Sequence, residues 1–383
     1  MAPDERATEE AATARDARDD AGDHDGEGGR RPLIWALLSH RSGESQQILG
    51  LAEALQRHGD WALRVVTPAW TPLANPLGLL RRTSLAGMHG EVRRALGARS
   101  PDLVISAGLR NEPIVRWLAA RSRGRTVTVM LGRTWAAPSA FDLVVTTPQY
   151  RLPPDPHVLE NPGTLHRISA PRLAAARAAF AEQFAPSRAP RLGLLVGGDS
   201  GPHRLGARAA ERLAKRAREL AGEGTVLATT SSRTPQIARH TLATRLSPDD
   251  LLWQWDDRGE NPYFGILAWA DALLVTGDSI AMVSEAVATG KPVRIFDPGG
   301  MRRDRQPPRD HTLRSLAYGL LMRLGPRRLS RDLGRVHAGL IEAGLAAWDD
   351  VPLQGPVDRG EVPADHMTTT MLRVRALVAG RRA

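Results

Sequence analysis

Short apolar runs alternate with amphipathic stretches along most of the chain, a pattern that predicts buried β-strands separated by helices. Three helices are expected in the first half, at Gln46–Arg57, Ala86–Leu96 and Pro113–Arg121. In the first of them, Ile48, Leu51 and Leu55 fall on one face, as packing on a sheet requires. The strands predicted around these helices are Leu33–Ser39, Leu63–Thr67, Asp102–Ser106, Thr126–Leu131 and Asp142–Thr147.

The same alternation resumes in the second half of the chain. Because apolar strands that alternate with helices form parallel sheets covered on both faces, the fold class is predicted as α/β. We expect two Rossmann-like, doubly wound domains that face a cleft, with ligands beyond the carboxyl ends of the strands. The strands predicted here are Leu192–Val196, Thr225–Thr230, Leu251–Trp255, Ala272–Thr276 and Val293–Phe296, and the helices are His203–Leu220, Pro235–Leu246, Tyr263–Trp269 and Ile280–Thr289.

Changes of composition suggest where these domains begin and end. Residues 1–31 lack aromatic and branched apolar side chains and are predicted to be a disordered acidic tail. No internal repeat is visible. The predicted divisions after the tail are an N-terminal domain at 32–170, a linker that ends near Arg188-Ala189-Pro190, a C-terminal domain at 187–310, and a helical segment at 311–383 that packs across both domains.

Charge and residue usage narrow the classes of function. The net charge is +10 although residues 1–31 hold ten acidic against five basic residues, so the positive charge lies in the body of the chain. A basic body suits anionic partners, although an arginine bias of a GC-rich bacterial genome explains it equally well. The absence of cysteine excludes disulfides and thiolate chemistry. Aromatic residues make up only 4%, and no nucleic-acid recognition module is visible, so no nucleic-acid partner is expected.

Hydropathy leads us to expect a cytoplasmic protein. No apolar run approaches the roughly 18 residues that span a bilayer, and the acidic N-terminus does not resemble a secretory signal. Residues 301–331 contain nine arginines against two acids, with interspersed leucines. This stretch is either a solvated basic face or a peripheral contact with an anionic membrane, such as the bacterial inner membrane.

The polar loop after the first predicted strand runs from Ser39 to Ser45 and opens a helix. Its ionisable groups, His40 and Glu44, are the candidate catalytic bases. Ser42 and Gly43 are candidate substrate contacts, because the free N–H groups at a helix start favour an anion. An ordinary turn, capped by Ser42 or Ser45, is the alternative interpretation.

Loops of the second half carry the stronger signals. Adjacent glycines either let a ligand approach the backbone or adopt positive φ, and hydroxyls, an arginine and a helix start together form a good phosphate cradle. A Gly-Asp-Ser turn in which Ser279 caps a helix, with Glu285 nearly two turns further on, is suited to phosphate and ribose. The candidate substrate-binding residues here are Gly197, Gly198, Ser231, Ser232, Arg233, Thr234, Glu260, Asn261, Gly277, Asp278, Ser279, Met282 and Glu285.

The C-terminal pattern resembles that of GT-B glycosyltransferases. More closely, T-S-x-R-T-P at 230–235, G-E-N-P-Y at 259–263 and T-G-D-S-x-x-M-x-S-E-A-x-x-T-G-K-P-V at 276–293 are similar to the mitochondrial-fission (elongated mitochondria) family, of which this chain resembles a bacterial member. N-x-G-x-L-H-R at 161–167 fits as well. The family's D-G-K-x-G-H-x-x-Q is altered here, with Ser39 at the Asp position and Glu44 at the His position, while Gly43 and Gln47 match.

This resemblance implies a glycosyltransferase-like protein that binds a nucleotide-diphosphate sugar as its substrate. Glu285 would hold the ribose, and the sugar would pass to a cell-envelope or lipid acceptor without a metal or cofactor. The lone D-x-D pair, Asp23 and Asp25, lies in the acidic tail. The alternative is a non-enzymatic adaptor on the same fold, since the family's plant namesake recruits a fission GTPase. An NAD-dependent epimerase is excluded because no G-x-G-x-x-G follows the first strand.

Overall fold

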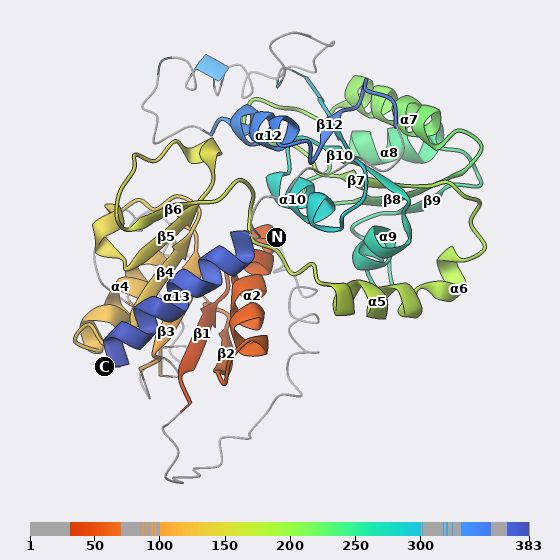
Figure 1. Cartoon of the computed structure of the whole chain (residues 1–383). Helices are drawn as coiled ribbons and strands as arrows, with labels where there is room; N and C mark the ends of the chain where they lie inside the picture. The colour runs from red at the N-terminus through yellow and green to blue at the C-terminus, as the bar shows by residue number, and fades with distance from the viewer. Residues whose placement is uncertain are drawn as a thin grey trace.

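Two open parallel sheets of six strands each form the body of the computed structural model, and in Figure 1 the first sheet lies below the second. The predicted acidic tail, most of the predicted helix Ala86–Leu96 and most of the basic stretch 301–331 lie outside the described residues. The structure describes residues 31–69, 100–299, 331–353 and 366–382, together with Leu85, Met88, Arg93, Arg94, Leu96, Met301, Ala317, Gly319, Leu320 and Leu324.

The first sheet has the strand order β2-β1-β3-β4-β5-β6, and all of its pairs are parallel. Strands β3 and β4 are buried at every position, because helices cover both faces of the sheet. Helices α2 (Ser42–Arg57) and α13 (His366–Arg382) cover one face, and α4 (Glu112–Arg121) covers the other. The strands are β1 (Leu33–Leu37), β2 (Ala62–Val66), β3 (Leu103–Ala107), β4 (Val127–Leu131), β5 (Leu143–Thr146) and β6 (Val158–Glu160).

The second sheet has the order β12-β11-β10-β7-β8-β9, which is the Rossmann order. One face is covered by α7 (Ala207–Ala221) and α8 (Gln236–Arg245), and the other by α9 (Tyr263–Trp269), α10 (Ile280–Ala288) and α12 (Leu333–Glu342). The predicted fold class, α/β with two Rossmann-like, doubly wound domains, is confirmed. The strands are β7 (Arg191–Val196), β8 (Thr225–Thr230), β9 (Leu251–Trp253), β10 (Ala272–Thr276), β11 (Val293–Phe296) and β12 (Ala347–Trp348).

The segment between the sheets is more ordered than the predicted linker. It contains α5 (Ala170–Ala179) and α6 (Ala181–Phe184). Helix α5 packs on α9, and the Phe184 side chain is buried in the core of the second domain. This segment therefore extends the second domain.

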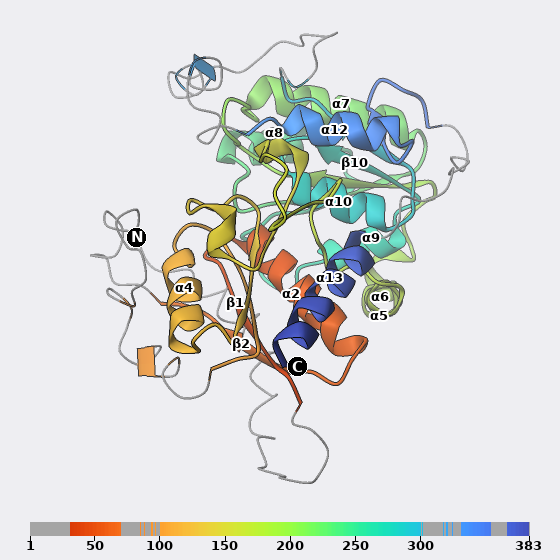
Figure 2. The same cartoon turned by 60° about the vertical axis from the view of Figure 1, so that its left-hand side comes forward.

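The chain returns to the first domain at its C-terminal end (Figure 2). Helix α12 and β12 pack with the second sheet, whereas α13 lies against α2 and β4 of the first. A hydrogen bond from the Asn161 amide nitrogen to the Thr370 hydroxyl, 3.0 Å long, fixes α13 beside residues 161–169, which connect β6 to α5 and are here termed the crossover segment. Within the described residues, no helix is long and apolar enough to cross a membrane.

Candidate functional site

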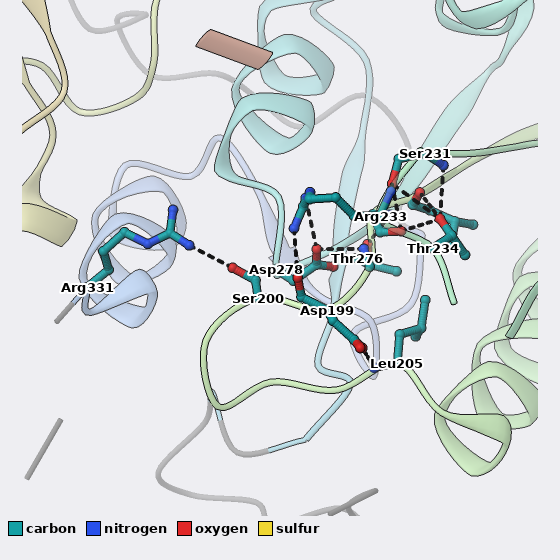
Figure 3. Close-up of polar contacts among 12 residues, drawn as sticks. Asp199, Ser200, Leu205, Ser231, Arg233, Thr234, Thr276, Asp278 and Arg331 are labelled. Carbon is teal, nitrogen blue, oxygen red and sulfur yellow. Dashed lines mark hydrogen bonds and ion pairs between the residues drawn. The ribbon is translucent and has the colours of Figure 1, made fainter. Parts of the chain in front are cut away.

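The order of the second sheet reverses between β7 and β10, so the loops after these two strands diverge there. Ligands of open α/β sheets bind in the crevice at such a point. The two loops are bonded to each other (Figure 3). The Gly197 N–H donates to the Thr276 hydroxyl over 2.7 Å, and the Gly198 N–H donates to the Asp278 carboxylate over 2.7 Å. The predicted glycine loop and the predicted Gly-Asp-Ser turn therefore meet.

The two glycines make room for protein groups. A Cβ on Gly197 would lie 2.7 Å from Oδ1 of Asp278, and one on Gly198 would overlap the carbonyl oxygen of Arg233. Neither glycine has positive φ. The close approach that was predicted for a ligand is made here by Asp278 and Arg233 of the protein itself, and the other predicted reason, positive φ, is wrong.

Asp278 joins three loops of the site. Its carboxylate is buried, accepts the Gly198 N–H and pairs with Nη2 of Arg233 at 3.2 Å. Burial raises its pKa, while the charge of Arg233 and the bond from Gly198 oppose the rise. The Arg233 guanidinium also donates to the Asp199 carbonyl and remains 43% exposed. Arg233 therefore presents a partly open cationic face above a supporting carboxylate.

The hydroxyls of the predicted phosphate cradle divide into two groups. Ser231 donates to the Gly197 carbonyl over 2.9 Å, and the Thr234 hydroxyl donates to the same oxygen. The Ser231 N–H in turn donates to the Thr234 hydroxyl over 2.9 Å. These two hydroxyls hold the loop after β8 against the loop after β7, whereas Ser232 is exposed. Ser232 and Arg233 are the residues of this cradle left to meet a ligand.

Helix α10 begins directly after the Gly277-Asp278-Ser279 turn. Ser279 occupies the N-cap position as expected, but its side chain makes no capping bond, so the predicted cap is wrong in that respect. In α2 the N-cap position is held by Arg41, which makes no side-chain capping bond, and Ser42 is the first residue of the helix. The Ser45 hydroxyl instead bonds both the N–H and the carbonyl of Ser39. The Ser279 side chain therefore leaves the start of α10, which faces the switch point, without a capping bond of its own.

Gly277 and Met282 hold α10 in place. A Cβ on Gly277 would lie 2.8 Å from the sulfur of Met301 and 3.1 Å from Cε1 of His337. The Met282 side chain packs against the apolar core of the second domain. These two predicted site residues therefore fix the helix against its surroundings.

Glu285 is buried on α10 and bonded to Tyr263 at the start of α9. The Tyr263 hydroxyl donates to the Glu285 carboxylate. Burial raises the pKa of Glu285 to about 7, while the bond from Tyr263 and the charge of Arg167 oppose the rise. Burial, followed by the Glu285 charge, raises the pKa of Tyr263 well above its usual value. In the sequence, Tyr263 belongs to a motif but is not predicted as a site residue. Its contact with Glu285 spans 22 residues, and no local pattern indicates such a contact.

The polar loop before Tyr263 contributes a turn. The Asn261 side-chain oxygen accepts the Tyr263 N–H over 3.0 Å at the start of α9, and Glu260 is exposed. Asn261 thereby helps to place the phenol beside Glu285. Glu260 has no defined role in the structure.

The loop after β1 carries the predicted bases of the first domain. The Ser39 hydroxyl donates to Glu44 over 2.5 Å, and Nη1 of Arg41 lies 3.4 Å from the same carboxylate. Glu44 is therefore already engaged. Burial lowers the pKa of His40, the charges of Arg110 and Arg41 lower it further, and Glu44 acts in the opposite direction. The His40 imidazole is thereby kept neutral at neutral pH and able to accept a proton.

Helix α10 also lies against the first domain. A Cβ on Gly43 would be 3.8 Å from Cβ of Ala281. The Thr164 N–H donates to the Ser284 hydroxyl over 2.9 Å. The loop after β1 and the switch point of the second sheet are therefore brought to opposite sides of one interface. Among the described residues, no three His, Asp or Glu side chains group as metal ligands.

Solved structures with a similar arrangement are distant in sequence. A UDP-GlcNAc 2-epimerase from Neisseria meningitidis bound to UDP-GlcNAc is 12% identical, with a TM-score of 0.45, over 90% of this chain and all of that one. The ADP-heptose LPS heptosyltransferase II of E. coli is 14% identical, with a TM-score of 0.43, over 81% of this chain and 99% of that one. Likenesses this remote carry no functional argument.

Sequence relatives are nearer but match over shorter stretches. The mitochondrial fission protein ELM1 of Arabidopsis thaliana is 36% identical over 146 residues, which is 38% of this chain and 34% of that protein. The uncharacterized protein RP120 of Rickettsia prowazekii is 39% identical over 70 residues, 18% of this chain and 20% of that protein. The chain thus matches about a third and a fifth of the length of these two proteins. The family model described as Mitochondrial fission ELM1 matches residues 42–318, well over half of the chain, which therefore belongs to that family.

Proposed function

We propose that the protein binds a nucleotide-diphosphate sugar at the switch point of the second domain and transfers the sugar to an acceptor on the first. The observation that carries this proposal is the meeting of the loops after β7, β8 and β10 where the strand order reverses. That point is where open α/β sheets take their ligands. Helix α10, which begins there, lies at Ala281 against Gly43 in the first turn of α2, three residues after His40.

The proposed role of each residue follows from the hydrogen-bonding or charged group that it can present to a ligand. The diphosphate meets the start of α10, the Ser279 hydroxyl and the exposed face of Arg233, which stabilise the leaving charge. Glu285, oriented by Tyr263, accepts hydrogen bonds from the ribose hydroxyls. His40 takes the proton of the attacking acceptor hydroxyl. The proposed reaction uses no metal.

Calorimetric titration of the full chain with UDP and with UDP-GlcNAc tests the donor site. We expect saturable binding, weakened about tenfold or more in Glu285→Gln, because the amide offers the ribose one acceptor oxygen fewer than the carboxyl group. Ser279→Ala is expected to weaken binding about fivefold for the loss of one hydroxyl contact. Glu219→Gln on α7 and Thr244→Ala on α8 are the matched controls and keep the wild-type affinity.

A non-enzymatic adaptor is the second candidate function. The observation that favours it is the internal use of predicted ligand groups, since Ser231, Thr234, Asp278 and Glu44 all bond to the protein itself. If the folded wild-type protein binds no common nucleotide or nucleotide sugar, that result would contradict the transferase proposal and favour the adaptor. The cytoplasmic location and the contact of residues 301–331 with an anionic membrane stay predictions.

A further inference from the structure

Two large apolar side chains stand exposed on neighbouring loops at the carboxyl edge of the first sheet. Leu109 follows β3 and Trp135 follows β4, and each is 40% exposed. The two strands pair in parallel with Ala107 opposite Leu131, so these loops leave the sheet side by side. Exposed apolar side chains gathered in this way mark a contact surface.

The position of Trp135 is fixed by a buried carboxylate. Glu112, at the start of α4, accepts the Trp135 N–H over 2.6 Å and the Ala136 N–H over 3.0 Å. The Thr134 hydroxyl closes the same turn by donating to the Ala136 carbonyl over 2.9 Å. A buried acid bonded to two loop amides holds the main chain at Trp135 in one place. The exposure of Trp135 is therefore built into the loop.

Positive charge adjoins these apolar side chains. Arg110, directly after Leu109, and Arg41 both act on His40 through their charges, and Glu44 is the acid that opposes them. Glu44 is already bonded to Ser39 and Arg41. Arg133 lies over the Tyr150 ring, 5.4 Å from its centre, at the start of the Trp135 loop. The charge around His40 therefore favours an anion.

We infer that this edge, formed by Leu109, Trp135, Arg41 and Arg110 and here termed the acceptor edge, binds an amphiphile in which an apolar chain carries an acidic head group. The inference rests on the proposed transfer reaction, for which it names the class of acceptor. The apolar chain of the amphiphile covers Leu109 and Trp135 and removes their apolar surface from water. The head group meets the arginines beside His40, which brings its hydroxyl to the proposed base.

Titration of the full chain with dodecyl phosphate, kept below its aggregation concentration, tests both halves of this chemistry. Inorganic phosphate supplies the head group alone, and dodecyl maltoside supplies the chain without the charge. We expect dodecyl phosphate to bind about tenfold or more tightly than either, because it alone satisfies both parts of the acceptor edge. Equal affinity for dodecyl phosphate and dodecyl maltoside would overturn the inference.

Substitutions locate the binding on the acceptor edge. Leu109→Ser and Trp135→Ser are each expected to weaken dodecyl phosphate binding about tenfold through lost apolar contact. Arg110→Gln is expected to weaken it about threefold. Ile237→Ser, an exposed apolar position on α8, and Arg57→Gln, at the far end of α2, are the controls and keep full affinity. Wild-type affinity in both serine variants would overturn the assignment.

The same preparations separate this inference from the proposed function. UDP binding by each variant, measured in parallel, also shows that the variant is folded. If UDP binds and dodecyl phosphate does not, the acceptor class is wrong and the donor site stands. If the wild type binds no UDP, the transferase proposal fails, and the acceptor edge loses its assigned role with it.

Discussion

At the scale of single residues, the second domain contains two buried titratable groups with opposite effects on stability. Burial raises the pKa of Glu285 from 4.5 to about 7 and lowers that of His337 from 6.5 to about 4. The native state therefore holds an extra proton on Glu285 and lacks one on His337 over nearly the same pH range. By linkage, the first makes stability fall as pH rises, and the second makes it rise.

Glu285→Gln should remove the first of these effects. Relative to wild type, we expect its free energy of unfolding to increase by about 3 kcal/mol between pH 4.5 and pH 7.5, since ionisation of the buried acid no longer costs stability. Urea denaturation at the two pH values measures the difference. Glu182→Gln, on the exposed surface of α6, is the control. The same difference from wild type at both pH values would contradict this explanation.

His337→Phe should remove the second effect. The His337 ring is fully buried, packs edge-on against Trp348 and lies beside Gly277. Wild type must fold with this ring neutral, which costs stability below pH 6.5. Relative to wild type, the free energy of unfolding of the variant should be raised by about 2 kcal/mol more at pH 4.5 than at pH 7.5. A gain that does not change with pH in the same denaturation series would rule this cause out.

At the scale of elements, the site depends on how closely its loops approach each other. The loop after β7 passes so near the loop after β8 that a Cβ at Gly198 has no space beside the Arg233 carbonyl. That obstacle is backbone, which cannot move aside as a flexible side chain does. The geometry at the switch point is thus set by main-chain contacts, and side chains such as Thr234 secure it.

Gly198→Ala should therefore destabilise the protein and disturb the donor site together. We expect a loss of about 2 kcal/mol or more, because the two loops must separate to admit the methyl group. Gly339→Ala on α12 is the matched control, with open space around its Cβ, and should gain up to about 1 kcal/mol from helix propensity. Thermal unfolding of both variants decides the matter, and comparable stability of the two would refute the packing explanation.

The elements that periodicity predicted are the ones with buried, regular faces. Strands such as β3 and β10 are wholly buried and appear in the sequence as continuous apolar runs. Strands β6 and β12 have three and two residues, too few for any pattern. Helix α5 has no fully buried residue and so shows little amphipathic signal. The bond between Tyr263 and Glu285 depends on tertiary packing, which a local pattern does not encode.

At the scale of the whole molecule, the order of the chain and the order of the domains differ. After α12 and β12 in the second domain, α13 returns to the first domain and buries Met371, Val374 and Val378 against it. The crossover segment is hydrogen-bonded to a helix on either side. Asn161 donates to Thr370 on α13, and the Thr164 N–H donates to Ser284 on α10. The first domain thus includes the end of the chain.

Val374→Ala should accordingly weaken the first sheet and spare the second. Val374 is fully buried, and its truncation removes about 2 kcal/mol of packing. Hydrogen exchange followed by mass spectrometry should show faster exchange in β3 with unchanged protection in β7, although α13 follows α12 of the second domain in sequence. Leu372→Ala on the same helix, 57% exposed, should leave both sheets unchanged. Equal loss of protection in both sheets would mean that the two domains open as one unit, so that α13 stabilises the whole interface and not the first sheet alone.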